Sequence, residues 1–62
     1  MKWVDVYQIR FESGRMVRLR VPGELADRTM VALVRVIEIE REITKELGSV
    51  VIEGPYKEWI LE

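Results

Sequence analysis

The sequence predicts a small two-layer α+β domain, because three patterns follow one another along its 62 residues. Apolar and polar residues alternate over residues 3–11 and again over 17–21, which is typical of half-buried strands. Residues 24–47 then repeat apolar side chains at helical spacing with no internal Gly or Pro. A β-branched segment follows at 49–53. The predicted fold class is an N-terminal antiparallel β-hairpin, one long α-helix packed on the sheet, and one or two short C-terminal strands (ββαβ or ββαββ).

Length and composition limit the chain to one domain, residues 1–62. A folded chain of this size buries only about 60% of the surface that its unfolded form exposes, so a monomer is marginally stable. The sequence has no Cys and no His, which excludes disulfides, the usual zinc-ligand sets and Cys-His or Ser-His nucleophile pairs. Self-association is the remaining source of stability, and it predicts an oligomer.

Neither a membrane span nor a signal peptide is indicated. The longest apolar run, which includes residues 31–34, is far shorter than the span of about 20 residues that a bilayer requires. Asp5 interrupts the N-terminal segment where a signal peptide needs its apolar stretch. We therefore expect a soluble, cytoplasmic protein that does not insert into membranes. The absence of Asn, the single Gln and the abundance of Glu, Arg, Val and Ile favour a thermophilic source.

The register of the hairpin follows from the loop that keeps charges off the apolar face. A two-residue loop would set Ile9 against Arg18, whereas a three-residue loop over 12–14 sets Ile9 against Val17. Gly14 then supplies the left-handed residue of a type I turn with a G1 bulge. The apolar face is expected to consist of the odd-numbered residues Trp3, Tyr7, Ile9, Phe11, Val17, Leu19 and Val21.

The other face of the hairpin is polar and mostly basic. Residues 1–22 carry five cations and two carboxylates, a net charge of +3, whereas residues 23–62 carry five cations and nine carboxylates, a net charge of −4. One interpretation is a nucleic-acid interface, because a two-stranded ribbon fits a major groove and Arg binds phosphate and guanine. We favour the alternative, in which Arg side chains of a solvated face pair with Glu of neighbouring strands. The candidate nucleic-acid contacts are Lys2, Arg10, Arg15, Arg18 and Arg20.

The helix is expected to begin at Glu24 and to end before Gly48, its C′ residue. The helix would span about 36 Å, whereas a strand of eight residues spans about 26 Å. Its apolar positions cover about half of the circumference, whereas packing on one sheet uses a stripe of about 100°. One stripe consists of Leu25, Ala32, Val36, Ile39, Ile43 and Leu47, and a second consists of Ala26, Met30, Leu33, Val34 and Ile37.

The surplus apolar surface of the helix predicts a partner. Closed two-fold dimers are the commonest oligomers, so we expect the same helix of a second copy, antiparallel about a two-fold axis. The alternative is that the C-terminal segment folds back over the second stripe. Glu40 lies between the stripes, where it either pairs with an Arg of the partner or reaches the rim. The candidate dimer-interface residues are Met30, Leu33, Val34, Ile37, Glu40 and Arg41.

Residues after the helix leave several arrangements open. Gly54-Pro55 is expected to break the strand over 49–53, so that residues 56–61 form a further strand, a hairpin or an arm on a partner. Tyr56 and Trp59 are expected to dock against a sheet edge or a second protomer.

No pattern in the sequence indicates an enzyme. The four glycines are isolated turn residues, so there is no phosphate-binding loop. Glu38, Glu40 and Glu42 diverge around a helix and cannot share one metal ion. We therefore expect no catalytic residue, no metal and no cofactor. The sequence favours a non-catalytic homodimeric interaction or scaffolding module, with a nucleic-acid-binding regulator as the alternative and a complex with a different protein as a third hypothesis.

Overall fold

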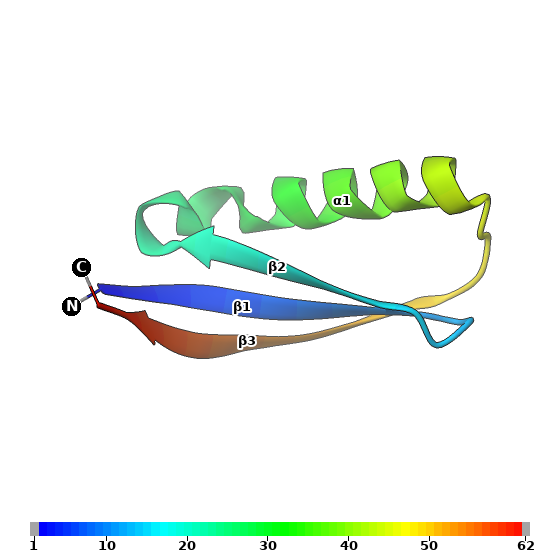
Figure 1. The fold of residues 1–62 in the computed structure, drawn as a ribbon. Helices are drawn as coiled ribbons and strands as arrows, with labels where there is room; N and C mark the ends of the chain where they lie inside the picture. Colours follow the sequence, from blue (N-terminus) through cyan, green and yellow to red (C-terminus); the bar gives the residue numbers. More distant parts are fainter. Residues whose placement is uncertain (1, 62) are drawn as a thin grey trace.

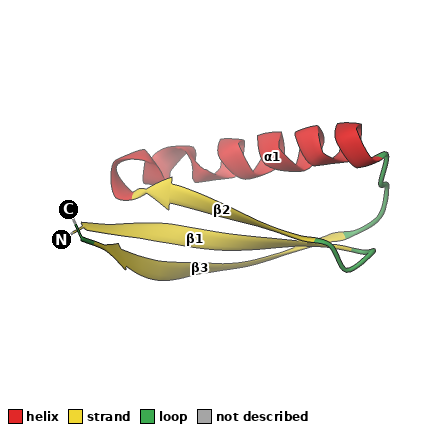
Figure 2. Ribbon diagram, in the orientation of Figure 1, coloured by secondary structure: helices red, strands yellow, loops and turns green. Residues whose placement is uncertain are grey.

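The computed structural model describes residues 2–61 as a three-stranded sheet with helices on one face (Figure 1). The 3-10 helix η1 (Gly23–Arg28) leads into the α-helix α1 (Thr29–Thr44). The strand order is β2-β1-β3, and both outer strands run antiparallel to β1 (Figure 2). The element order is therefore ββαβ, one of the two that the sequence predicts. The strands are β1 (Lys2–Phe11), β2 (Met16–Pro22) and β3 (Val50–Ile60).

The hairpin has the predicted register and turn. Ile9 lies opposite Val17, so the apolar odd-numbered residues of both strands share one face. The Phe11 N–H donates to the Arg15 carbonyl at 2.8 Å and closes a three-residue loop. Gly14 has a φ of +97°, the left-handed conformation that the G1 bulge requires and that glycine adopts without steric cost.

The helical segment is not the single helix over residues 24–47 that the sequence predicts. Its first six residues form η1, in which Leu25 departs from helical geometry with φ −109° and ψ 15°. α1 has 16 residues and is about 24 Å long, whereas β1 and β3 have 10 and 11 residues and span about 33–36 Å. The expectation that the α-helix is longer than its sheet is wrong, because α1 has 16 residues instead of 24 and β3 continues through Gly54-Pro55.

The end of α1 also differs from the prediction. Lys45, and not Gly48, follows the last helical residue, with a φ of 61° and its N–H donating to the Arg41 carbonyl at 2.8 Å. Gly48 instead lies against the hairpin loop, where any larger side chain would meet the Glu12 carboxylate. That carboxylate accepts a hydrogen bond from the Ser49 N–H at 3.3 Å. Gly48 thus lets the connection to β3 pass close to the hairpin loop.

Gly54-Pro55 does not end the C-terminal strand, contrary to the prediction. β3 pairs with β1 from end to end, and its register shifts by one residue where Gly54 and Pro55 face the middle of β1. This β-bulge exchanges the faces of the residues that follow it. Ile52 before the bulge and Trp59 after it therefore lie on the helix side of the sheet, although one number is even and the other odd.

The hydrophobic core lies between α1 and the odd-numbered face of the hairpin. Ile9, Phe11 and Leu33 form its centre, and each is at most 4% exposed. This arrangement confirms the predicted apolar face of the hairpin. The partly buried residues that pack against the centre are Tyr7, Val17, Leu19, Val36, Ile37 and Val50.

The other face of the sheet, the open face, is not covered by any helix or strand of the described residues (Figure 1). Val4 and Val6 of β1 are nevertheless buried there. Arg20 of β2 reaches across the central strand to Glu58 of β3, with 3.0 Å between the charged groups, and these long side chains shield the two valines. On the helix side of the same strand, Asp5 is also buried, because β1 is the central strand and lies between β2 and β3.

The small core predicts that Leu33→Ala unfolds much of the protein. Removing a buried leucine side chain costs about 2–5 kcal/mol, and a core of this size supplies only about 3–5 kcal/mol. Leu47→Ala, at a residue that is 83% exposed, is the matched control and should leave the urea midpoint unchanged. Circular dichroism during urea unfolding measures the midpoints of both variants. Equal midpoints would contradict the placement of Leu33 in the core.

The bulge predicts that Gly54→Ala is destabilising by about 1–3 kcal/mol. Gly54 has a φ of +125°, and a Cβ at this position would lie 2.8 Å from the Val6 carbonyl oxygen. Gly23→Ala is the matched control, since its Cβ would meet the Trp3 ring at an ordinary 3.8 Å. Thermal unfolding of the two variants should separate them, and a Gly54→Ala variant as stable as the control would show that β3 does not bulge here.

Candidate interaction surfaces

The fold leaves a large apolar surface uncovered for its size. Six hydrophobic residues of the described chain are buried, whereas fourteen large hydrophobic residues are exposed. The accessible surface is 4650 Å², compared with about 4,200 Å² for a compact monomer of this mass. The radius of gyration is 12.5 Å, compared with about 10.6 Å for a compact chain of this length. The protomer is therefore extended and only partly covers its own apolar residues.

The solvent side of α1 carries exposed apolar side chains that lie next to one another. Met30, Val31 and Val34 are 71%, 72% and 48% exposed. Together with Arg35 and Glu38 they line a shallow hollow, and these five residues are termed the outer α1 face. An ion pair of 3.6 Å joins Arg35 to Glu38. The outer α1 face thus presents three neighbouring apolar side chains beside one cation and one anion.

The six residues predicted for a dimer interface divide between two sides of α1. Met30 and Val34 lie on the outer α1 face, whereas Leu33 is buried and Ile37 packs against the core of its own chain. The sequence predicts one stripe for these four residues, because helical angles do not show which part of a wide apolar arc faces the sheet. Val31 belongs to neither predicted stripe, although it is among the most exposed apolar residues of the helix.

The remaining two predicted interface residues fasten α1 to its own sheet. The Glu40 carboxylate accepts a hydrogen bond from the Arg15 guanidinium. The Arg41 guanidinium donates to the Gly48 carbonyl at 2.7 Å, which ties the helix to the connection that leads into β3. Both side chains therefore have partners within the protomer.

The basic residues of the hairpin are largely paired with carboxylates. On the open face, Arg10 pairs with Glu53 at 3.2 Å, as Arg20 does with Glu58. Lys2 lies 3.7 Å from a Glu24 oxygen. The carboxylates of both ion pairs on the open face come from β3. Pairing of Arg with Glu across strands is the interpretation of this basic face that we favour over a nucleic-acid interface.

Arg15 and Arg18 differ from the other predicted nucleic-acid contacts. Arg15 lies on the helix side, with its guanidinium carbon 5.4 Å from the centroid of the Phe11 ring and its charge paired with Glu40. Arg18 projects from the open face, and no ion pair is found for it among residues 2–61. The structure thus brings together only part of the predicted basic set, and nucleic-acid binding stays a prediction, to be tested by titrating a labelled duplex at low salt.

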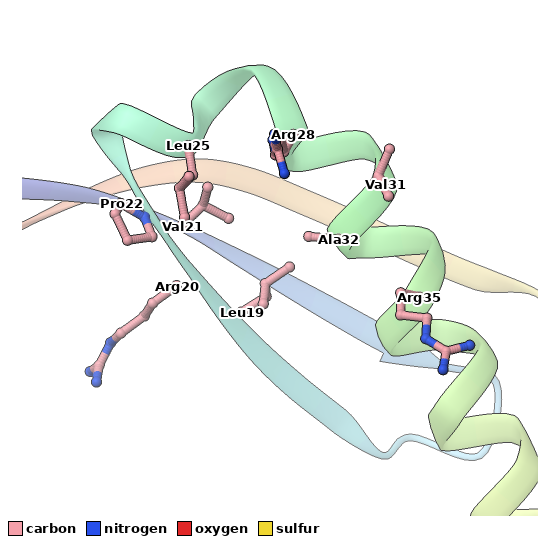
Figure 3. Close-up of a pocket in the computed structure, with 9 residues that line it drawn as sticks. All are labelled: Leu19, Arg20, Val21, Pro22, Leu25, Arg28, Val31, Ala32 and Arg35. Atoms are coloured by element: carbon pink, nitrogen blue, oxygen red, sulfur yellow. The ribbon is translucent and has the colours of Figure 1, made fainter.

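A second apolar hollow lies between the edge strand β2 and the helices (Figure 3). Leu19 and Val21 of β2 and Leu25 of η1 point into it, and Ala32 of α1 faces it from above (Figure 3). This β2–α1 groove has a volume of about 340 Å³. Its remaining lining residues are Arg20, Pro22, Arg28, Val31 and Arg35.

Trp3 and Trp59 lie at the sheet end opposite the hairpin loop. The Lys57 ammonium lies 3.6 Å from the centroid of the Trp3 ring, a cation–π contact. Trp59 pairs with Trp3 across the β1–β3 ladder. Trp59 and Tyr56, expected to be docked, remain 62% and 51% exposed, because they belong to the outer strand itself.

The described residues show neither a metal site nor a membrane-spanning helix. Within residues 2–61, no three side chains of the metal-ligating types come together as a candidate site. None of the described helices is both long and apolar enough to cross a bilayer. A comparison with protein-family models, curated proteins and solved structures finds no match to this chain.

Proposed function

We propose that this chain is a small non-catalytic homodimeric interaction module, in which the outer α1 faces of two protomers pack against each other. The observation that carries the proposal is the exposure of Met30, Val31 and Val34 side by side on one helix. Burying such side chains contributes about 1.5–3 kcal/mol each. That gain is comparable with the whole stability expected for a 62-residue monomer.

The charges on the outer α1 face favour a second copy as the occupant. Arg35 and Glu38 lie one turn apart on the same face. An antiparallel second helix reverses their order, so that each charge approaches the opposite charge of the partner. A surface that is complementary to itself in this way generates a closed two-fold dimer.

The uncovered area is consistent with a dimer interface. A stable interface buries about 800 Å² of each partner, and the protomer exceeds the surface of a compact monomer by about 500 Å². The outer α1 face alone is too narrow for the whole interface, so flanking exposed side chains of α1 would complete it.

A binding role agrees better than a catalytic one with the two apolar hollows. Both are open and lined mainly by aliphatic side chains and arginines. Catalytic pockets instead bring several polar groups together around a buried substrate. We therefore assign the surface of this module to protein contacts.

Light scattering at low micromolar concentration tests the proposal. The expected mass is twice the 7.3 kDa of the chain, and Val34→Glu should reduce it to that of the monomer by placing two carboxylates beside the two-fold axis. Leu47→Glu is the matched control, since it adds the same charge at a residue that is 83% exposed and lies beyond α1. This control should remain a dimer.

A second variant separates loss of the dimer from loss of the fold. Glu38→Arg, at a position that is exposed in the protomer, should weaken the dimer by facing two cations, while circular dichroism confirms that the helix persists. A monomeric wild-type protein, or a Val34→Glu variant that stays dimeric, would overturn the proposal.

A further inference from the structure

We propose that the edge of β2 accepts an extended acidic segment of a different protein as a fourth strand, with the apolar side chains of that segment in the β2–α1 groove. The segment would alternate aliphatic residues with Glu or Asp. This surface is separate from the outer α1 face in its main contacts, which come from β2 and η1. Val31 and Arg35 line both hollows, so the two surfaces adjoin along α1.

The backbone of β2 has an unpaired edge. β2 is the outermost strand of the sheet, in which it pairs only with β1. Because Phe11 donates to the carbonyl of Arg15, the alternation of an antiparallel ladder directs the backbone groups of Val17, Leu19 and Val21 toward β1. The N–H and C=O groups of Arg18 and its even-numbered neighbours then point away from the sheet. Such a row of groups is a template for a further strand.

The side chains of β2 define which strand would fit. Residues opposite Leu19 and Val21 would face the β2–α1 groove, whose other walls are the side chains of Leu25 and Ala32 (Figure 3). These positions require aliphatic side chains. Residues opposite Arg18 and Arg20 would lie on the open face and meet guanidinium groups.

Carboxylates are already the partners that this face uses. Glu58 of β3 reaches Arg20 at 3.0 Å and Glu53 reaches Arg10 at 3.2 Å. For Arg18 on the open face and Arg28 beside the groove, no ion pair is found within residues 2–61. Both cations flank the edge of β2. An acidic strand would therefore supply carboxylate partners for Arg18 and Arg28.

The same arginines disfavour pairing of β2 with a second copy of itself. In an antiparallel β2–β2 pair, Arg18 of one chain would lie opposite Arg18 or Arg20 of the other. Like charges directly opposite each other destabilise a strand pair. The edge is therefore protected against self-association while it remains complementary to an acidic strand.

The test uses four synthetic peptides and the protein labelled with 15N, as wild type and as two variants. The probe is an eight-residue capped peptide that alternates Glu with Val or Leu. One control peptide carries Lys in place of Glu, and the other has the same composition with its Glu residues grouped at one end. NMR titration measures affinity, and hydrogen exchange measures the amides of Met16, Arg18 and Arg20.

The expected result is that only the alternating acidic peptide binds, at least tenfold more tightly than either control, and protects these three amides at least tenfold. Arg18→Glu should weaken binding at least tenfold. Lys45→Glu makes the same charge change beyond the end of α1 and outside the groove. This control should have little effect on the affinity for the peptide. An alternating acidic peptide N-methylated on every second residue keeps its side chains but should lose the affinity, without any change to the protein.

Three outcomes would overturn the proposal. Equal binding of the Lys peptide would show that the arginines do not select an acidic ligand. Equal binding of the grouped peptide would show that the ligand does not need alternating acidic and aliphatic residues. Binding without protection of the β2 amides would show that the ligand lies elsewhere. The oligomeric state of the free protein is measured independently, so failure here leaves the proposed homodimer untouched.

Discussion

A single helix on a three-stranded sheet can bury only the side chains that lie between the two layers, and this constraint governs the whole protein. The contacts of Ile9, Phe11 and Leu33 fill that space. Every other apolar residue must be shielded by long charged side chains, lie at a sheet edge, or face solvent. The exposed Met30, Val31 and Val34 are the part of α1 that this arrangement cannot cover.

Charged side chains of the open face partly take the place of a missing second layer. Exposed ion pairs contribute only about 0–1 kcal/mol each to stability. The attraction between their charges is therefore only part of what the Arg–Glu pairs contribute to the open face. The pair of Arg20 and Glu58 spans the central strand and covers the aliphatic carbons of Val4 and Val6. The basic character of the hairpin and the acidic character of the remaining chain therefore complement each other within one sheet.

Local patterns were sufficient to predict the hairpin but not the segments whose conformation depends on distant residues. Alternation and the position of Gly14 determine register and turn, because both act within a few residues. Adjacent Gly54 and Pro55 predict a break, and only the pairing of β1 on both sides of the bulge shows that they lie within one strand. Helical angles likewise predict a wide apolar arc, but the side of α1 that faces the sheet depends on residues far away in the sequence. Ile9 and Phe11 pack with Leu33, and Arg15 contacts Glu40.

The claim that the protomer needs a partner to cover its apolar surface is tested most directly by the dependence of stability on protein concentration. Urea unfolding followed by circular dichroism at about 1 and 100 µM compares the free energy of unfolding in the two regimes. For a dimer that unfolds to separate chains, each tenfold increase in concentration adds about 1.4 kcal/mol and raises the midpoint by about 0.5–1 M urea. The account predicts this rise. A midpoint that is the same at both concentrations would contradict it.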